Sequence, residues 1–482
     1  MKSALAIAAE VRSGGISASA ILAETLNTIS ARDPAINAFT TRLDAQARRD
    51  AAAVDAAIAA GRDPGPLAGV PFAVKNLLDI AGVTTLNGAR INADSAPATA
   101  DATVVRRLRE RGAILVGALN MDAYAYGFTT ENTHYGPTHN PHALTHSAGG
   151  SSGGSAAAIA AGMVPLTLGS DTNGSIRVPA SLCGVFGLKP TFGRVSRAGA
   201  ASFVHDLDHL GPFAACTDDL AAAYEAIAGP DAHDHACSTR ALDPVASTLS
   251  AGATGLRIAV AGGYFDGPLA PEARAAIARA AATLGVRDSI VLPRADTARA
   301  SAFVLTASTA GSLYLPQLRA RAQDFEPLSR DRLLAGALIP AAWLHAAQRF
   351  RRWYHDRVLE IFQTVDAIIA PATPCSALPL GTESMTLDGQ TMAVRPNLGM
   401  YTQPISFIGL PVAAVPIECG SALPIAVQVI AAPWREDICL RIASALERAG
   451  AARARIASAA GPSQGAGPLG GRRRAAPLRG DQ

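Results

Sequence analysis

The chain has 482 residues, of which 49% are hydrophobic and 17% are charged, and its formal net charge is +3. So small a charge excludes the strongly basic surface of most nucleic-acid-binding proteins. Six scattered cysteines show no metal-ligand or CxxC spacing, and no apolar stretch reaches the roughly 20 residues of a membrane-spanning helix. Since no secretory leader is recognised either, the sequence predicts a soluble cytoplasmic protein with no membrane partner and no direct nucleic-acid partner.

The first 60 residues are rich in alanine and have the periodicity of amphipathic helices, which end at Gly61. Beyond them, helical patterns alternate with short apolar runs typical of buried strands. In chain order we expect a strand over 69–78, a helix over 103–111, a strand over 113–117, a helix over 155–161, a strand over 164–168, a helix from 217, strands over 256–260, 365–370, 412–416 and 425–430, and a helix over 436–449.

Two segments depart from this alternation. Residues from about 265 to 360 are mostly helical and are expected to form an insertion or a cap over the core. Residues 459–482 consist mainly of Gly, Pro, Ser, Ala and Arg and are expected to be a disordered tail. The remainder predicts a single α/β domain over residues 1–458, with a sheet covered by helices on both faces.

Two Gly/Ser clusters, over 149–155 and 169–175, carry the strongest chemical signal. Hydroxyls and bare backbone N–H groups at this density suit attack on a carbonyl whose oxygen becomes negative. Ser175 follows a predicted strand and the turn Thr172-Asn173-Gly174, so the amides of this turn could converge on one point beside its hydroxyl. The local pattern also fits an ordinary turn with good helix-capping residues.

The first cluster satisfies the pattern G-x-S-x-G at both Ser151 and Ser152, which in α/β-hydrolases marks a nucleophile elbow. That motif needs a strand directly before the serine, and residues 146–150 do not read as a strand. A flexible or phosphate-binding loop is the other interpretation. A Walker A loop is excluded because no Gly-Lys-Ser/Thr triplet follows.

Lysine usage singles out Lys75. The chain has only three lysines, Lys2, Lys75 and Lys189, although Lys and Arg together number 42. Lys75 ends the apolar run 70–75, and a buried lysine can lose its proton whereas an arginine cannot. It is therefore a candidate base, or alternatively a lysine at a strand end whose ammonium reaches solvent. Four histidines before the first Gly/Ser cluster are interpreted as loop residues: His134, His139, His142 and His146.

Taken together, these segments resemble the amidase signature family. The resemblance rests on residues 149–155, 169–180 and 183–191, on the lysine segment 67–76 and on the later Gly409-Leu410-Pro411, and it extends from about residue 5 to 450. It implies the α/β fold of that family, built on a central twisted mixed sheet, and a reaction that needs no metal and no cofactor.

The resemblance also implies roles for particular residues. Family members use a Ser–cisSer–Lys triad, in which a neutral lysine takes the proton of the nucleophile through a bridging serine. By motif position, Ser175 matches the nucleophile, Ser151 the bridging serine after a cis peptide bond, and Lys75 the base. The positions of the oxyanion turn are Thr172, Asn173, Gly174 and Ser175. The supporting positions are Ser152, Asp171 and Arg177.

Within the family, segments 75–80, 120–132, 171–179 and 401–411 are similar to the 1-carboxybiuret hydrolase branch. That branch implies release of ammonia from a small urea-like amide that bears a carboxylate. It also implies a small accessory subunit, and we expect an oligomer. The substrate-pocket positions suggested by the resemblance are Tyr124, Tyr126 and Tyr401.

The alternative is the A subunit of the glutamyl-tRNA amidotransferase, which hydrolyses glutamine, since residues 120–122 and 206–212 are similar to it. Against it, Ala123, Tyr126 and Val178 stand where that branch has an acidic residue, a methionine and a glutamine. Residues 397–404 also lack the acidic residue that would hold the amino group of glutamine. A silent binding module with the same fold is a further alternative, disfavoured because all three triad positions are occupied.

Overall fold

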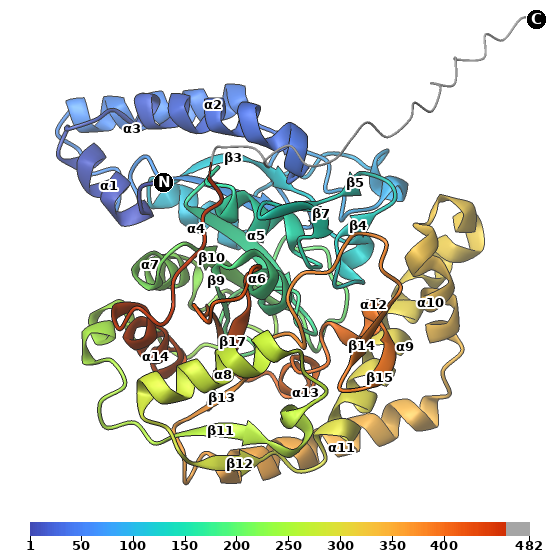
Figure 1. The fold of residues 1–482 in the computed structure, drawn as a ribbon. Helices are drawn as coiled ribbons and strands as arrows, with labels where there is room; N and C mark the ends of the chain where they lie inside the picture. Colours follow the sequence, from blue (N-terminus) through green and yellow to red (C-terminus); the bar gives the residue numbers. More distant parts are fainter. Residues whose placement is uncertain (459–482) are drawn as a thin grey trace, which may run out of the picture.

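An eleven-stranded mixed sheet organises the computed structural model, which describes residues 1–458 (Figure 1). The predicted α/β fold class, with helices on both faces of this sheet, is confirmed. In spatial order the strands are β1 (Phe39–Arg42), β3 (Ile114–Leu119), β2 (Pro71–Lys75), β8 (Leu166–Asp171), β10 (His209–Ala214), β9 (Phe186–Lys189), β16 (Val412–Pro416), β17 (Ala426–Ala431), β13 (Ala367–Pro371), β11 (Ile258–Gly262) and β12 (Ser289–Val291).

The directions of the strands determine which reactive side chains lie close together. Strand β2 runs parallel to both β3 and β8, and β11 runs parallel to β12 and β13, whereas the remaining pairs are antiparallel. The central strands are buried on both faces, and β2 and β16 accordingly consist almost entirely of apolar residues, whereas β8 also carries Thr, Ser and Asp. Because parallel neighbours end at the same edge, Lys75 at the end of β2 and Asp171 at the end of β8 lie together.

Helices cover the sheet in two groups. Helices α5 and α6 contact each other and pack on β8, β9 and β10, while α7 and α14 pack on β9, β10, β16 and β17 from the other side. Helix α5 consists only of small residues and one isoleucine, so its backbone can approach the sheet closely. The helices are α1 (Ala4–Arg12), α2 (Ala18–Ile36), α3 (Asp44–Ala59), α4 (Thr103–Glu110), α5 (Gly153–Ala160), α6 (Arg177–Cys183), α7 (Thr217–Ile227), α8 (Pro271–Leu284), α9 (Ala295–Arg321), α10 (Pro327–Ala337), α11 (Ala341–Ile361), α12 (Val394–Asn397), α13 (Gln403–Ser406) and α14 (Glu436–Arg448).

The N-terminal segment is helical as predicted, except for one strand. Figure 1 shows α2 and α3 side by side at the top of the molecule, and they pack on each other. Between them, the chain leaves α2 through Asn37 in a left-handed conformation and forms β1, which pairs antiparallel with β3. Four residues are too short for a periodicity signal, so this strand depends on its pairing with a distant partner.

The predicted helical segment from about 265 to 360 contains α8 to α11 and the edge strand β12. Helix α8 packs on β13 and β17, and therefore belongs to the layer that covers the sheet. Helices α10 and α11 both pack on α9 instead, and α9 also contacts α13 (Figure 1). This last contact brings the segment close to the turn that carries Ser175.

Three small two-stranded sheets complete the described part of the chain. No helix within residues 1–458 combines the length and the apolar character that crossing a membrane requires. Residues 459–482, predicted to be a disordered tail, lie outside the described residues. The strands of the small sheets are β4 (Glu131–Asn132) with β5 (Gly136–Pro137), β6 (His139–Asn140) with β7 (Ala143–Ser147), and β14 (Ser384–Leu387) with β15 (Gln390–Ala393).

Candidate active site

The two Gly/Ser clusters meet Lys75 at one edge of the sheet. Lys75 is the last residue of β2, and the second cluster begins in the last three residues of β8, its parallel neighbour, and continues into the following turn. The first cluster leads into α5, which packs on both of these strands. Residues from three distant parts of the chain therefore surround one point at the carboxyl ends of β2 and β8.

Lys75 is completely buried between two serines. Its Nζ lies 2.6 Å from Ser151 Oγ and 2.9 Å from Ser170 Oγ. Among the described residues, no carboxylate lies within ion-pair distance of this amine. Burial lowers the pKa of Lys75 to about 7, although the more distant charges of Asp122 and Asp171 favour the protonated form. The amine can therefore exist in both protonation states near neutral pH.

The other buried lysine shows that a low pKa alone does not mark a base. Burial also lowers the pKa of Lys189 to about 7, with the nearby Arg177 guanidinium as the next cause. Within residues 1–458, however, the one hydrogen bond of the Lys189 Nζ is to the backbone carbonyl of Pro190, at 3.1 Å. Lys75 is distinguished by its contact with two hydroxyls, not by its pKa.

The Ser151 hydroxyl is held by a tight turn. The peptide bond between Gly150 and Ser151 is cis, as the resemblance implied. A Cβ atom at Gly150 would lie 2.1 Å from the Asp122 carboxylate, so no larger residue fits there. Asp122 in turn accepts hydrogen bonds from the N–H groups of Thr129 at 3.2 Å and Thr130 at 3.0 Å.

Ser152 connects the two clusters, which fits its expected supporting position. Its hydroxyl donates to the Ser170 carbonyl at 3.1 Å, and its N–H donates to the Ser175 carbonyl at 3.3 Å. The prediction that residues 146–150 contain no strand is wrong in part, because β7 runs to Ser147. This strand pairs only with β6 and ends four residues before Ser151, so the geometry of a nucleophile elbow is absent.

Asp171 and Arg177 form an ion pair with no exposed surface. Arg177 Nη2 lies 2.9 Å from Asp171 Oδ1, and Nε lies 3.0 Å from Oδ2. Burial by itself raises the pKa of Asp171, but the guanidinium outweighs burial and holds that pKa below the usual range of a carboxyl. Arg177 also donates to Gln428 Oε1 at 2.6 Å and to the Thr402 carbonyl at 3.1 Å, which ties the pair to β17 and to the start of α13.

The same carboxylate shapes the turn that carries Ser175. Asp171 accepts from the N–H of Gly174 at 2.7 Å and of Ile176 at 3.1 Å. The prediction that the Gly174 amide faces an oxyanion therefore needs correction, because its single donor is already used. The amides of Thr172, Asn173 and Ser175 donate no hydrogen bond within the described residues and remain candidates for the oxyanion hole. Gly174 has a φ of 136°, and a Cβ there would lie 2.1 Å from Thr402 Oγ1.

Ser175 occupies this turn with 3% of its surface exposed. Within residues 1–458, no hydrogen bond joins its hydroxyl to another group, and the Ser151 hydroxyl contacts Lys75 instead. The structure thus brings Lys75 and Ser151 into direct contact. It places Ser175 on the adjoining turn, linked to the first cluster through its backbone carbonyl.

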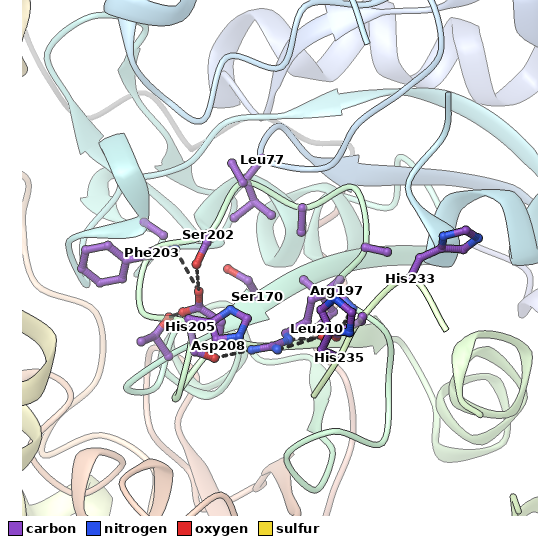
Figure 2. Close-up of a pocket in the computed structure, with 16 residues that line it drawn as sticks. Leu77, Ser170, Arg197, Ser202, Phe203, His205, Asp208, Leu210, His233 and His235 are labelled. Atoms are coloured by element: carbon purple, nitrogen blue, oxygen red, sulfur yellow. Dashed lines mark hydrogen bonds and ion pairs between the residues drawn. The ribbon is translucent and has the colours of Figure 1, made fainter. Parts of the chain in front are cut away.

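A cavity of about 180 Å³ reaches this site from the side of Ser170 and Thr172 (Figure 2). Its apolar wall includes Ala125 and Phe203, and its polar wall includes Asp208. In the described part of the chain, no group of three or more His, Cys, Asp or Glu side chains has an arrangement suited to a metal ion. The other polar or charged residues of the wall are Arg197, Ser202, His205, His233, Asp234 and His235.

None of the three tyrosines expected in the pocket lines this cavity. The Tyr124 ring is completely buried and stacks on Phe325, at 5.2 Å between ring centroids. Tyr126 lies behind the cavity wall, packed against Phe203 at 4.9 Å. Tyr401 is also completely buried, and its hydroxyl donates to a backbone carbonyl at 2.9 Å. Packing against neighbouring elements, which a sequence pattern does not reveal, holds all three rings away from the cavity.

Three further residues belong to the site but were not assigned a role from the sequence: Asp122, Ser170 and Asp208. Ser170 is the second partner of Lys75 and lies inside a recognised Gly/Ser cluster. Asp208 accepts from Thr172 Oγ1 at 2.6 Å, and burial raises the pKa of this carboxyl despite that hydrogen bond. Asp122 and Asp208 both lie in sequence segments that resemble the family, but only the tertiary structure shows which groups they contact.

Comparison with known proteins identifies the family. A family model described as Amidase matches residues 20–440, which include Lys75 and both Gly/Ser clusters. The chain belongs to the amidase family. This membership makes the protein a hydrolase of amide C–N bonds.

Two named relatives and one solved structure are similar to this amidase over most of its length. It is 56% identical over 445 residues to the AtzE subunit of 1-carboxybiuret hydrolase from Pseudomonas sp. (strain ADP), an alignment that covers 92% of this chain and 97% of the relative. It is 37% identical over 460 residues to the A subunit of glutamyl-tRNA(Gln) amidotransferase from Moorella thermoacetica, covering 90% and 93%. A solved structure described as "An unexpected vestigial protein complex reveals the evolutionary origins of an s-triazine catabolic enzyme" has a TM-score of 0.93 and 55% identity, covering 94% of this chain and 100% of that one.

The buried ion pair gives a prediction about stability. Replacing Arg177 by Met leaves the Asp171 charge buried without its partner, which should lower the free energy of unfolding by about 3–5 kcal/mol. The measurement is urea unfolding followed by circular dichroism. The double variant Arg177→Met with Asp171→Asn removes both charges and should recover part of this loss. A single-variant loss as small as that of an exposed ion pair would contradict the bracing role.

Proposed function

We propose that this chain releases ammonia from a small urea-like amide bearing a carboxylate, with 1-carboxybiuret as the first candidate substrate. The observation that carries the chemistry is the 2.6 Å contact between the buried Lys75 amine and the Ser151 hydroxyl. The 56% identity to 1-carboxybiuret hydrolase AtzE, over 92% of the chain, supports the substrate class. A cavity of about 180 Å³ suits a small molecule rather than a peptide.

In the first half-reaction, Ser175 Oγ forms a bond to the amide carbon. Its proton passes to Ser151, whose own proton moves to Lys75. Only an unprotonated amine has a free lone pair for this step, and a pKa of about 7 keeps much of Lys75 unprotonated at neutral pH. The backbone amides of Asn173 and Ser175 stabilise the negative charge that develops on the carbonyl oxygen.

Collapse of the tetrahedral intermediate then breaks the C–N bond. Lys75 returns the proton through Ser151 to the leaving nitrogen, so that ammonia departs and an ester remains on Ser175. Water attacks this ester, Lys75 again receives the proton, and cleavage of the C–O bond restores the Ser175 hydroxyl. The sum of the steps is one amide and one water converted to one acid and one ammonia.

A second candidate function is glutamine hydrolysis within a tRNA-dependent amidotransferase. The 37% identity to the A subunit of glutamyl-tRNA(Gln) amidotransferase favours it. It ranks second because that identity is lower, and because residues 397–404 offer no carboxylate to bind the amino group of glutamine.

The proposal includes an oligomer that contains a small accessory subunit. A relative of this chain has been solved as a protein complex. Around the junction of α10 and α11, two large apolar side chains face outward, since Leu338 is 82% exposed and Trp343 is 61% exposed. Large apolar side chains that are exposed in this way are common at protein interfaces.

An ammonia-release screen tests the substrate assignment. The compounds are 1-carboxybiuret, biuret, malonamate, glutamine and simple aliphatic amides. We expect the highest kcat/KM with 1-carboxybiuret, because the chain most resembles the hydrolase of that substrate among the relatives compared. Glutamine as the best substrate, with a rate raised by a tRNA-binding partner, would instead establish the second candidate.

Substitutions at the triad test the assigned roles. Ser175→Ala should lower kcat/KM by about 10⁴-fold or more, because no covalent intermediate forms. Lys75→Arg keeps the charge but provides no base, and should lower kcat/KM by about 10²–10⁴-fold. Circular dichroism and thermal melting check that both variants fold. Full activity of Ser175→Ala would refute the nucleophile assignment, and a small effect of Lys75→Arg would refute the base.

The pH dependence of kcat/KM tests the protonation state of Lys75. Because only the neutral amine accepts a proton, kcat/KM should rise by ~tenfold per pH unit in acid and level off above the Lys75 pKa of about 7. Lys189→Met is the matched control, since it removes the other buried lysine and should leave the midpoint in place. A midpoint that moves in this control, or a rate that is independent of pH from 5 to 8, would contradict the assignment.

A further inference from the structure

Asn173 lies two residues before Ser175, with 7% of its surface exposed. Its side chain is held from α9, since Nδ2 donates to Thr306 Oγ1 at 2.8 Å. Its backbone carbonyl accepts from Thr402 Oγ1 at 2.6 Å. Contacts from two distant segments therefore fix both the side chain and the backbone of this residue.

The carboxamide oxygen of Asn173 has no partner. Oδ1 is buried and accepts no hydrogen bond within the described residues. Among the buried side-chain polar atoms without a partner in residues 1–458, it alone lies on the turn that carries Ser175. A buried acceptor without a donor is unfavourable, and at a reactive site a bound ligand is one source of the missing donor.

The position of Asn173 beside Ser175 restricts which group of a substrate can donate the missing hydrogen bond to Oδ1. The attacked carbonyl has its oxygen toward the amides of the turn, and its leaving nitrogen has to face Ser151 and Lys75 to receive a proton. The third substituent then has no assigned partner, and we assign it to the unpaired Oδ1 of Asn173, which lies two residues before the nucleophile. In a urea-like substrate this group is an N–H, which donates a hydrogen bond, whereas in a carbon-chain amide it is a methylene, which does not.

We propose that Asn173 selects ureido substrates by accepting a hydrogen bond from the N–H beside the attacked carbonyl. This inference rests on the proposed function and names the residue that distinguishes a urea-like amide from amides such as malonamide or glutamine. Thr306 is a positioning residue, because its hydroxyl accepts from Asn173 Nδ2 and thereby fixes the carboxamide with Oδ1 as its unpaired atom. A methylene in place of the N–H leaves Oδ1 unsatisfied in the complex, which is how a polar site rejects an analogue that lacks a donor.

The test compares biuret with malonamide, which differ only by an N–H replaced by a methylene. The quantity measured is the ratio of kcat/KM for the two compounds, from ammonia release, so that a general loss of activity cancels. The variants are Asn173→Ala, Asn173→Leu, which keeps the approximate shape of the side chain, and Thr306→Val, which removes the acceptor of Nδ2. Thermal melting identifies any variant that fails to fold.

We expect both Asn173 variants to lower the biuret-to-malonamide ratio by roughly tenfold to a hundredfold, the size of one lost hydrogen bond to a buried group. Thr306→Val should lower the ratio in the same direction by a smaller factor. An unchanged ratio in the Asn173 variants, whatever their total activity, overturns the inference while leaving the proposed function intact. If the unmodified enzyme hydrolyses glutamine or aliphatic amides but no ureido compound, the proposed function fails and this inference fails with it.

Discussion

Asp171 and Arg177 meet where β8 gives way to α6, and neither side chain has any exposed surface. A buried ion pair is tolerated only when each charge is fully hydrogen-bonded, because both have lost their hydration. Arg177 meets this requirement with donors to Gln428 and to the Thr402 carbonyl. Asp171 meets it by accepting the N–H groups of the turn around Ser175. The hydrogen bonds that offset the lost hydration of this ion pair therefore also fix the conformation of the turn that carries Ser175.

This pair also affects the chemistry of Lys75. The negative charge of Asp171 favours a protonated Lys75, and the Arg177 guanidinium holds Asp171 in that charged form by lowering the pKa of its carboxyl. Because no carboxylate among residues 1–458 pairs with Lys75, its pKa responds mainly to burial and falls to about 7. The absence of a close carboxylate is as important to the proposed relay as the presence of Ser151, because a paired lysine would keep its proton.

The helical segment from about 265 to 360 takes part in the site through α9. Thr306 on α9 holds the Asn173 side chain, and Arg299 on the same helix donates to Gln403 Oε1 at 2.9 Å. The sequence predicts the helical character of this segment but not its role. Its contacts join residues more than 100 positions apart, and amphipathic periodicity shows only that a helix has a buried face, not which loop that face meets. The same limit explains the missed strand β1, whose four residues are defined by pairing with β3.

The sequence by itself determined the α/β alternation, the two Gly/Ser clusters and the unusual Lys75, because strand burial, turn chemistry and residue scarcity are local properties. It also indicated the family, since each motif is a specific run of residues that can be recognised without knowledge of the fold. Only the tertiary structure decided that Ser170 is the second partner of Lys75, that Gly174 gives its N–H to Asp171, and that Tyr124 stacks inside the core. Each of these outcomes depends on burial and on the competition for a single donor or acceptor. Both are set only when distant segments pack together.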